Sequence, residues 1–338
     1  MNKITTIGLD LAKNVFHVVC CDDNGKIIRK KMLKRSQVLS YFANLPAGLV
    51  GMEACASAHY WARELNTLGH QVKLIPPQYV KPYVRGNKND YNDALAIAEA
   101  VVRPEMRFAA VKTTEQQDVQ ALYRLRERQI ADRTALCNQL RGLLAEYGLV
   151  LPKGVNVVRK RLPELLEDAE NGLNDLFRRL LARSYQALRE LDEHIDFYTC
   201  EMARESQQSD ACQRLQTIPG YGPIVASVFH SMVGTGEAYR RGRDVSASLG
   251  LVPRQHGSGG KEVLLGISKR GDRYLRSLLV HGARAVVIRA VNKEDRLSRW
   301  INKVRAQRGY NKATVALANK MARIGWAVLA HKSVYQPA

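Results

Sequence analysis

Residues 253–276 combine a hydroxyl group with glycines and cations, and they read PRQHGSGGKEVLLGISKRGDRYLR. Ser258 stands among three glycines, and His256 precedes it by two residues. Glycines let a backbone approach a ligand closely, and neighbouring backbone amides can bind a phosphate there. The residue types therefore fit a serine nucleophile presented to a phosphodiester, and a solvated hairpin tip is an equally good interpretation of this stretch alone.

Two familiar templates do not fit this loop. A nucleotide-binding P-loop requires G-x-x-x-x-G-K-[ST], but Gln255 takes the place of the first glycine and Glu262 follows the lysine. A hydrolase elbow requires G-x-S-x-G, but His256 takes the place of its first glycine. The loop belongs to neither class.

Four carboxylates near the N-terminus are placed to form a second chemical centre. Asp10 and Glu53 each end a short apolar run that is typical of a buried strand. Asp90 and Asp93 open a helical pattern, and their spacing puts both on one helix face.

Converging carboxylates repel one another unless cations lie between them, and hard oxygen ligands suit Mg²⁺, with Mn²⁺ as a substitute. Two such ions can clamp a scissile phosphate. The alternative for Asp90 and Asp93 is that they merely cap a helix N-terminus, where acidic side chains are favoured in any case. The matching strand-end positions of Asp10 and Glu53 favour the metal site.

The first region has the element order that would position these carboxylates. Three strands joined by short turns precede a helix, a strand, a helix and a strand, which is the order of a ribonuclease H-like fold. Ser57 is expected to cap the second helix. The expected strands span 4–10, 15–21, 26–32, 49–53 and 71–75, and the helices span 36–44 and 57–68.

The middle of the chain is strongly helical. One helix is expected over 114–147, and a second long helix after Pro152 has apolar positions from Leu173 to Met202. This near-heptad pattern indicates a coiled coil or a helical hairpin, and an intramolecular hairpin fits it equally well. Arg126 and Arg133 interrupt the apolar seam. The near-neutral charge favours oligomerisation over nucleic-acid contact.

The last region begins with Ile-Pro-Gly-Tyr-Gly at 218–222, a helix-hairpin-helix signature in which Gly220 and Gly222 could hold a backbone phosphate. A plain glycine turn is the alternative. Helices are expected over 272–290, 294–307 and 311–331, and their large apolar residues, including Trp300 and Trp326, are expected to be core. The fold class is thus mixed α/β followed by an all-α part.

The charge indicates a polyanionic partner. The net charge is +20, and residues 211–338 alone carry 22 basic and 6 acidic side chains, a net +16. Nucleic acid is the favoured partner, with an anionic membrane surface as the weaker alternative. Neither a membrane-spanning run, a signal-peptide core nor a zinc spacing among the six cysteines is recognisable, so we expect a cytoplasmic protein without structural zinc.

The whole chain closely resembles the DEDD insertion-sequence transposases (IS-one-hundred-ten family, IS-eleven-eleven branch). The resemblance rests on GLDLAK, MEAC, NKNDYNDA, IPGYGP and the 253–276 stretch. It implies a RuvC-like (ribonuclease H-like) domain at 1–112, a coiled-coil oligomerisation region at 113–206 and a transposase domain at 210–338. Relatives often have another small residue, frequently serine, in place of Gly257, which leaves Ser258 as the only hydroxyl of this tip.

The resemblance also implies a mechanism. Asp10, Glu53, Asp90 and Asp93 would hold Mg²⁺, and Ser258 would form a phosphoserine link to DNA. A structured noncoding RNA, the bridge RNA, would select donor and target DNA by base pairing. The metal site of one subunit would work with the serine of another in a tetramer, nucleoid-associated in a bacterial cytoplasm. The residues expected to bind nucleic acid are Gly220, Gly222, Arg254, Lys261, Lys269, Arg270, Arg273 and Arg276.

Two rival functions remain at this point. A RuvC-like structure-specific endonuclease would use water as the nucleophile, and Ser258 would then be structural. A non-catalytic nucleic-acid-binding protein would keep the carboxylates only as remnants. The first rival predicts cleavage that survives Ser258→Ala, and the second predicts no cleavage.

Overall fold

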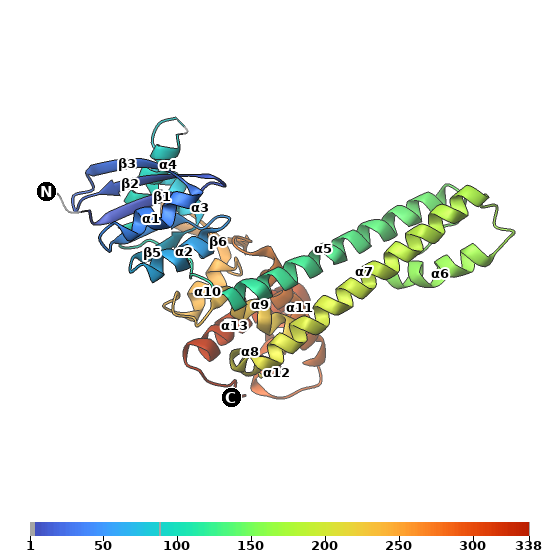
Figure 1. Cartoon of the computed structure of the whole chain (residues 1–338). Helices are drawn as coiled ribbons and strands as arrows, with labels where there is room; N and C mark the ends of the chain where they lie inside the picture. The colour runs from blue at the N-terminus through green and yellow to red at the C-terminus, as the bar shows by residue number, and fades with distance from the viewer. Residues whose placement is uncertain (1–3, 88, 338) are drawn as a thin grey trace. The chain divides into compact units, whose positions relative to one another are not determined.

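The computed structural model describes residues 4–87 and 89–337 and divides the chain into two compact units, 1–114 and 115–338 (Figure 1). The regions expected at 113–206 and 210–338 belong to the same compact unit. Their separate functional roles stay a prediction. In the part of the chain that is described, no helix is long and apolar enough to cross a membrane.

A five-stranded mixed sheet forms the centre of the N-terminal unit. The strand order is β3-β2-β1-β4-β5, in which β1 pairs antiparallel with β2 and parallel with β4. This is the order expected for a ribonuclease H-like sheet, and every expected strand lies within two residues of an observed one. The strands are β1 (Thr6–Asp10), β2 (Val15–Cys21), β3 (Ile27–Lys34), β4 (Leu49–Glu53) and β5 (Gln71–Ile75).

Alternation along the strands gives the sheet two apolar faces. Ile7 and Leu9 of β1 pack in one core with α1 (Val38–Ala43) and α2 (Ala58–Thr67). The opposite face packs against α4 (Asp90–Val101), and the short α3 (Pro77–Val80) lies beside α4. The capping expectation for Ser57 is wrong, because its side chain makes no capping hydrogen bond and its backbone is left-handed, with φ of 65°.

Two glycines let α4 approach the sheet closely. A Cβ atom added at Gly8 would lie 1.9 Å from the Ala94 carbonyl oxygen, and one at Gly51 would lie 2.9 Å from the Val101 Cβ. Only residues without a side chain fit there. The close approach matters for function because it brings the first turn of α4 to the end of β1, where Asp10 stands.

An antiparallel pair of long helices, α5 (Thr114–Ala145) and α7 (Asp175–Gln208), projects within the second unit, with α6 (Val155–Glu167) beside it (Figure 1). Tyr147, just after α5, stacks on Phe177 with ring centroids 4.2 Å apart. The sequence left open whether the apolar seam is paired within the chain or between chains. The structure pairs it within the chain, and oligomerisation stays a prediction.

The two arginines that interrupt the seam have partners inside the hairpin. Arg126 donates from Nε to Thr199 Oγ1 at 2.7 Å, and Arg133 donates to Asp192 Oδ1 at 2.8 Å. Asp192 also pairs with Arg159 of α6. Although burial acts to raise the pKa of Asp192, the hydrogen bonds from both arginines lower it. One carboxylate thus joins three helices.

Replacing Asp192 by Asn is expected to lower the free energy of unfolding by about 2 kcal/mol, because the largely covered Arg133 and the partly exposed Arg159 lose their charged partner. Urea denaturation monitored by circular dichroism measures the change. Asp196→Asn, on the same helix, is the matched control because no ion pair is found for Asp196 among the described residues. Equal stability of the two variants would contradict the bridging role.

The sequence analysis missed α6, because it expected one long helix after Pro152. Pro163 lies inside α6 and removes a backbone donor, so the segment does not look helical from its sequence. Tertiary packing overrides this penalty, since Val158, Leu162 and Leu165 are all buried against α5 and α7. The loop between α5 and α7 is therefore a packed helix that widens the hairpin.

A helical bundle forms the rest of the second unit, with α13 (Tyr310–Ala330) packed against several of its helices. Leu279 and Ala283 of α11 and Leu317 and Met321 of α13 lie at its centre. Tyr123 of α5 stacks on Tyr274, which ties the base of the hairpin to this core. The other elements are α8 (Asp210–Gln216), α9 (Pro223–Val233), α10 (Gly242–Ser248), β6 (Pro253–Ser258), β7 (Lys261–Ile267), α11 (Arg273–Arg289) and α12 (Arg296–Arg308).

Candidate active site

Three carboxylates of the N-terminal unit converge. Asp10 is the last residue of β1, and Asp90 and Asp93 lie in the first turn of α4. One ligand oxygen from each lies within 4.8 Å of the other two. Glu53 ends the neighbouring parallel strand β4, but it lies outside this group of three. The structure therefore brings three of the four expected metal ligands together and places the fourth at the adjacent strand end.

The first turn of α4 does not use its aspartates as caps. Asn89 occupies the N-cap position, and its side chain accepts a hydrogen bond from the Tyr91 amide at 2.9 Å. Asp90 and Asp93 are thus free of the capping role that was the alternative to metal binding. Their position in a helix first turn is electrostatically favourable in any case.

Mutual repulsion and burial perturb this cluster. The pKa of Asp10 is raised to about 6, mainly by burial and then by the charges of Asp93, Asp90 and Glu53. The charge of His17 lowers this pKa in part. Burial and the charge of Asp93 also raise the pKa of Glu53. Raised carboxyl pKa values of this kind indicate a negative field that a bound cation would neutralise.

The donor set fits a divalent metal. It consists of carboxylate oxygens, which Mg²⁺ and Mn²⁺ prefer, and it contains neither the thiolates nor the paired imidazoles of a zinc site. Asp10, Asp90 and Asp93 would form the core of the metal site, and Glu53 would reach it from β4.

Ser258 lies at the tip of an exposed two-stranded hairpin. It ends β6 and pairs across the strands with Lys261, the first residue of β7. Gly259 and Gly260 form the turn, with φ of 56° and 78°, and positive φ at both positions is typical of a type I′ turn. The stretch therefore folds as a hairpin, which was one of the two interpretations of its sequence. Cross-strand pairing puts Ser258, Lys261, His256 and Val263 on one face of the ribbon.

Comparison with known proteins covers both units. Residues 7–149 match a family model for the DEDD transposases of IS110, and residues 212–298 match a model described as transposase IS116/IS110/IS902 family. The chain is 47% identical to a transposase for insertion sequence element IS1111A from Coxiella burnetii, over 99% of this chain and 92% of that protein. It is also 47% identical to a probable family 20 transposase from Pseudomonas aeruginosa and 43% identical to a transposase for insertion sequence element IS1328 from Yersinia enterocolitica, over 99% of both chains in each case. The chain belongs to the IS110 family of DEDD transposases.

This assignment makes the protein an insertion-sequence transposase, which is a DNA-processing enzyme with DNA as substrate. DEDD transposases typically use a divalent metal, and the carboxylate cluster is the matching part of this chain. The close relatives span its full length, so the assignment covers both compact units.

His17 of this transposase contacts the cluster, although the sequence analysis did not single it out. It pairs with Asp10 across β1 and β2, and its Nδ1 lies 3.5 Å from Asp90 Oδ2. Its ring meets the edge of Tyr91 with centroids 4.7 Å apart, and only 12% of its side chain is exposed. The imidazole therefore holds one carboxylate of the cluster in place. Only the strand register reveals this role, because His17 and Asp90 are 73 residues apart.

Replacing His17 by Ala is expected to weaken Mn²⁺ binding about 10- to 100-fold, because partners that orient a metal ligand typically have effects of this size. Electron paramagnetic resonance of free Mn²⁺ measures the affinity. His59→Ala is the matched control, since His59 is half-buried in the same unit and bonds to the Lys112 amide instead. Unchanged affinity in His17→Ala would show that Asp90 needs no orienting partner.

The residues expected to bind nucleic acid fall into two groups. Arg254, Lys261, Lys269, Arg270 and Arg273 are exposed and available to a phosphate backbone. Lys269 has a left-handed backbone, with φ of 56°.

Arg276 and Gly220 have structural partners in this fold. Arg276 donates from Nη1 to the carbonyl oxygens of Leu249 and Arg270, both at 2.9 Å, and so holds the segment after the serine hairpin. A Cβ atom at Gly220 would lie 2.9 Å from the Gly282 carbonyl oxygen, so this glycine allows helix packing. Gly222 is exposed and open before α9, where a phosphate could approach. Nucleic-acid contact by all of these residues stays a prediction.

Proposed function

We propose that this transposase is a bridge-RNA-guided serine recombinase, in which Ser258 is the nucleophile and Asp10, Glu53, Asp90 and Asp93 hold Mg²⁺. The observation that carries the proposal is the position of Ser258. It is exposed at a tight turn, beside Lys261, in a chain that also has a converging carboxylate cluster. A serine with a merely structural role would not need to be exposed at a turn beside a cation.

The strand-cleavage step is a transesterification. Ser258 Oγ forms a bond to the scissile phosphorus, the bond from phosphorus to one deoxyribose oxygen breaks, and that oxygen takes up a proton from solvent and leaves as a hydroxyl. The serine proton passes to a base or to solvent. The Lys261 ammonium stabilises the negative charge that develops on the phosphate. Bound Mg²⁺ would supply further charge neutralisation at the phosphate. Attack by the hydroxyl of a second DNA end on the phosphoserine restores a phosphodiester and frees Ser258 without ATP.

The second unit has features that support assembly into an oligomer and binding of a guide RNA. Residues 211–338 carry a net charge of +16, which suits simultaneous contact with DNA and a structured RNA. The α5–α7 hairpin exposes large apolar side chains on α7, with Leu176 60%, Leu180 55% and Phe197 59% exposed. Such side chains support a homo-oligomer, which we propose to be a tetramer. The RNA would select the DNA sites by base pairing, and the protein would recognise backbone and shape.

The decisive experiment is a search for a covalent protein–DNA adduct. The full chain, the noncoding RNA of its element, labelled donor and target DNA and Mg²⁺ are incubated and separated on a denaturing gel with and without protease. We expect a protease-sensitive shifted band that Ser258→Ala and Asp10→Asn both lack. Ser277→Ala, which removes an exposed hydroxyl of α11, is the matched control and should keep the band.

The principal alternative is a RuvC-like, metal-dependent endonuclease that uses water. Strand cleavage without any adduct, persisting in Ser258→Ala, would replace the proposal by this alternative. A third outcome is that the protein binds DNA and RNA equally well with and without Mg²⁺ but cleaves no strand, under conditions in which a relative cleaves its own element. That outcome would indicate a non-catalytic nucleic-acid-binding protein.

A further inference from the structure

A large groove lies in the second unit and is not used by the proposed chemistry. Its volume is about 1310 Å³, and it is bordered by α10, α12, α13 and the C-terminal half of β7. Five cations line it, and the described residues that line it include no Asp or Glu. The cations are Arg241, Arg243, Lys312, Lys320 and Arg323.

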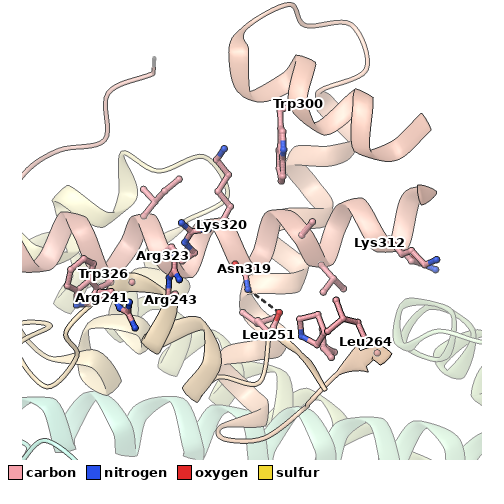
Figure 2. A pocket seen from close by; sticks show the side chains of 18 of the residues that line it. Arg241, Arg243, Leu251, Leu264, Trp300, Lys312, Asn319, Lys320, Arg323 and Trp326 are labelled. Carbon is pink, nitrogen blue, oxygen red and sulfur yellow. Dashed lines mark hydrogen bonds between the residues drawn. The ribbon is translucent and has the colours of Figure 1, made fainter. Parts of the chain in front are cut away.

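Much of the groove lining is apolar. The lining side chains include Trp300, Trp326 and Leu264 of β7, which Figure 2 shows together with Lys320 and Arg323. The Lys320 ammonium lies 4.6 Å from the centroid of the Trp300 ring. The sequence analysis expected both tryptophans to be core, and this expectation is only half right. Each is half-buried, with a ring that packs on the core and also lines open space.

We propose that this groove binds an unpaired DNA strand, the one that continues from the phosphate attacked by Ser258. The inference rests on the proposed function, because it takes Ser258 to be the site of strand attack. Cations along the rim would hold backbone phosphates, and Trp300 would stack on a base.

The dimensions and chemistry favour a polymer with exposed bases. Small-molecule pockets usually enclose roughly 300–1,000 Å³, and this groove is larger and open. Base stacking on an aromatic side chain needs a free π-face, which a base inside a duplex does not offer. The five cations complement a chain of phosphates. Arg241 is the least available of them, since its Nε lies 3.8 Å from Asp244.

The groove has few groups that could identify bases or a ribose hydroxyl. Asn319 donates from Nδ2 to the Leu251 carbonyl oxygen at 3.1 Å, as the dashed line in Figure 2 shows. Trp326 donates from Nε1 to the Gly236 carbonyl oxygen at 3.0 Å. With these donors engaged, the groove would bind mainly by charge and stacking, and deoxyribose would suit its apolar lining.

The connection with the nucleophile favours DNA over the guide RNA. Leu264 and Leu265 line the groove and lie on β7, the strand that pairs with the Ser258 strand. Leu264 is the third residue after Lys261 along β7, a distance of about 10 Å at the rise of an extended chain. A strand bound in the groove would therefore run toward the serine at the hairpin tip.

The test is fluorescence anisotropy of labelled oligonucleotides with the full chain carrying Ser258→Ala, so that binding is measured without cleavage. The probes are dT12, the 12-base-pair duplex dT12·dA12 and rU12. We expect dT12 to bind most tightly. Arg243→Gln with Arg323→Gln should weaken dT12 binding at least tenfold and reduce the slope of log K against log salt by about 1.4, because two phosphate contacts are lost.

The stacking contact has its own pair of variants. Trp300→Ala should weaken dT12 binding about tenfold, whereas Trp300→Phe, which keeps a ring, should restore most of it. Arg289→Gln with Arg308→Gln is the charge-matched control, since both residues are exposed and neither lines the groove. Thermal melting by circular dichroism confirms that each variant is folded.

The outcomes separate the groove from the proposed function. Unchanged dT12 affinity and salt slope in the Arg243/Arg323 variant, or tighter binding of duplex or rU12 than of dT12, would overturn the groove assignment. If the adduct assay succeeds while these binding tests fail, the serine mechanism stands without the groove. If no adduct forms but the variants lose dT12 binding as expected, the groove stands as a single-strand site on its own.

Discussion

Replacing Asp10 by Asn is expected to reduce strand cleavage by at least about a thousandfold and, at the same time, to make the metal-free protein more stable at pH 8. The loss of activity follows because a metal supplies several kcal/mol of charge stabilisation to a phosphoryl transition state, and each 1.4 kcal/mol is a factor of ten. The gain in stability follows because Asp10 is half-buried among other carboxylates. Function and stability thus oppose each other at this residue.

The sign of the pH dependence can be worked out. Burial and the neighbouring carboxylates raise the pKa of Asp10 from 3.8 to about 6, so the folded protein binds this proton more tightly than the unfolded chain. The stabilising contribution is complete below pH 3.8 and is lost as the pH rises through about 6. Asp10→Asn should therefore raise the melting temperature in EDTA at pH 8 but leave it nearly unchanged at pH 4.

Calorimetry with and without Mg²⁺ completes this test. Mg²⁺ should raise the melting temperature of the wild type and have no effect on Asp10→Asn, because binding to the folded state alone stabilises it. Asp23→Asn, at an exposed turn of the same unit, is the matched control and should respond to Mg²⁺ as the wild type does. A metal-free Asp10→Asn protein that is less stable than the wild type at pH 8 would sink the electrostatic argument.

The position of the candidate metal ligands could be predicted from the sequence because strand ends are local features. Asp10 and Glu53 each follow a short β-branched and apolar run, and parallel strands bring their carboxyl ends to one sheet edge. The i and i+3 spacing of Asp90 and Asp93 likewise needs only the helical repeat. The spacing cannot predict the distance of Glu53 from the other three carboxylates. This distance depends on side-chain rotamers and on how closely α4 packs against the sheet.

Other features depend on contacts between residues far apart in the chain. Asp90 meets His17 only because the β1–β2 register sets His17 opposite Asp10. The role of Gly220 is packing against Gly282, which a turn signature cannot reveal. Arg276 resembles any other arginine in a basic stretch until its bonds to two carbonyl oxygens are seen. A sequence shows which residue types are present, and the fold decides which are already engaged.

The groove illustrates the same limit for apolar residues. Trp300 and Trp326 occur at helical spacing with other apolar side chains, and that pattern predicts core. The pattern does not show whether the opposite side of each ring is covered. Here both rings line the open groove. Half-buried aromatic residues beside cations are thus a structural finding.

The serine hairpin permits a test of whether its turn geometry matters for attack. Gly259→Val is expected to slow adduct formation about a hundredfold, because a β-branched residue is strained at φ of 56° and a two-stranded ribbon is barely stable by itself. Displacement of a nucleophile by about 1 Å can cost a factor of this size. Single-turnover rates of adduct formation on the denaturing gel measure the effect.

Gly259→Asn is the matched variant, because valine and asparagine have similar bulk but differ in backbone preference. Asparagine tolerates a left-handed backbone, and Asn-Gly is a favoured type I′ turn. Nothing lies within 4 Å of a Cβ atom at Gly259, so either side chain starts into open space. Gly259→Asn should therefore keep a rate close to that of the wild type. Equal rates for the two variants would mean that Ser258 attacks from a loose loop and that the ordered turn has no part in catalysis.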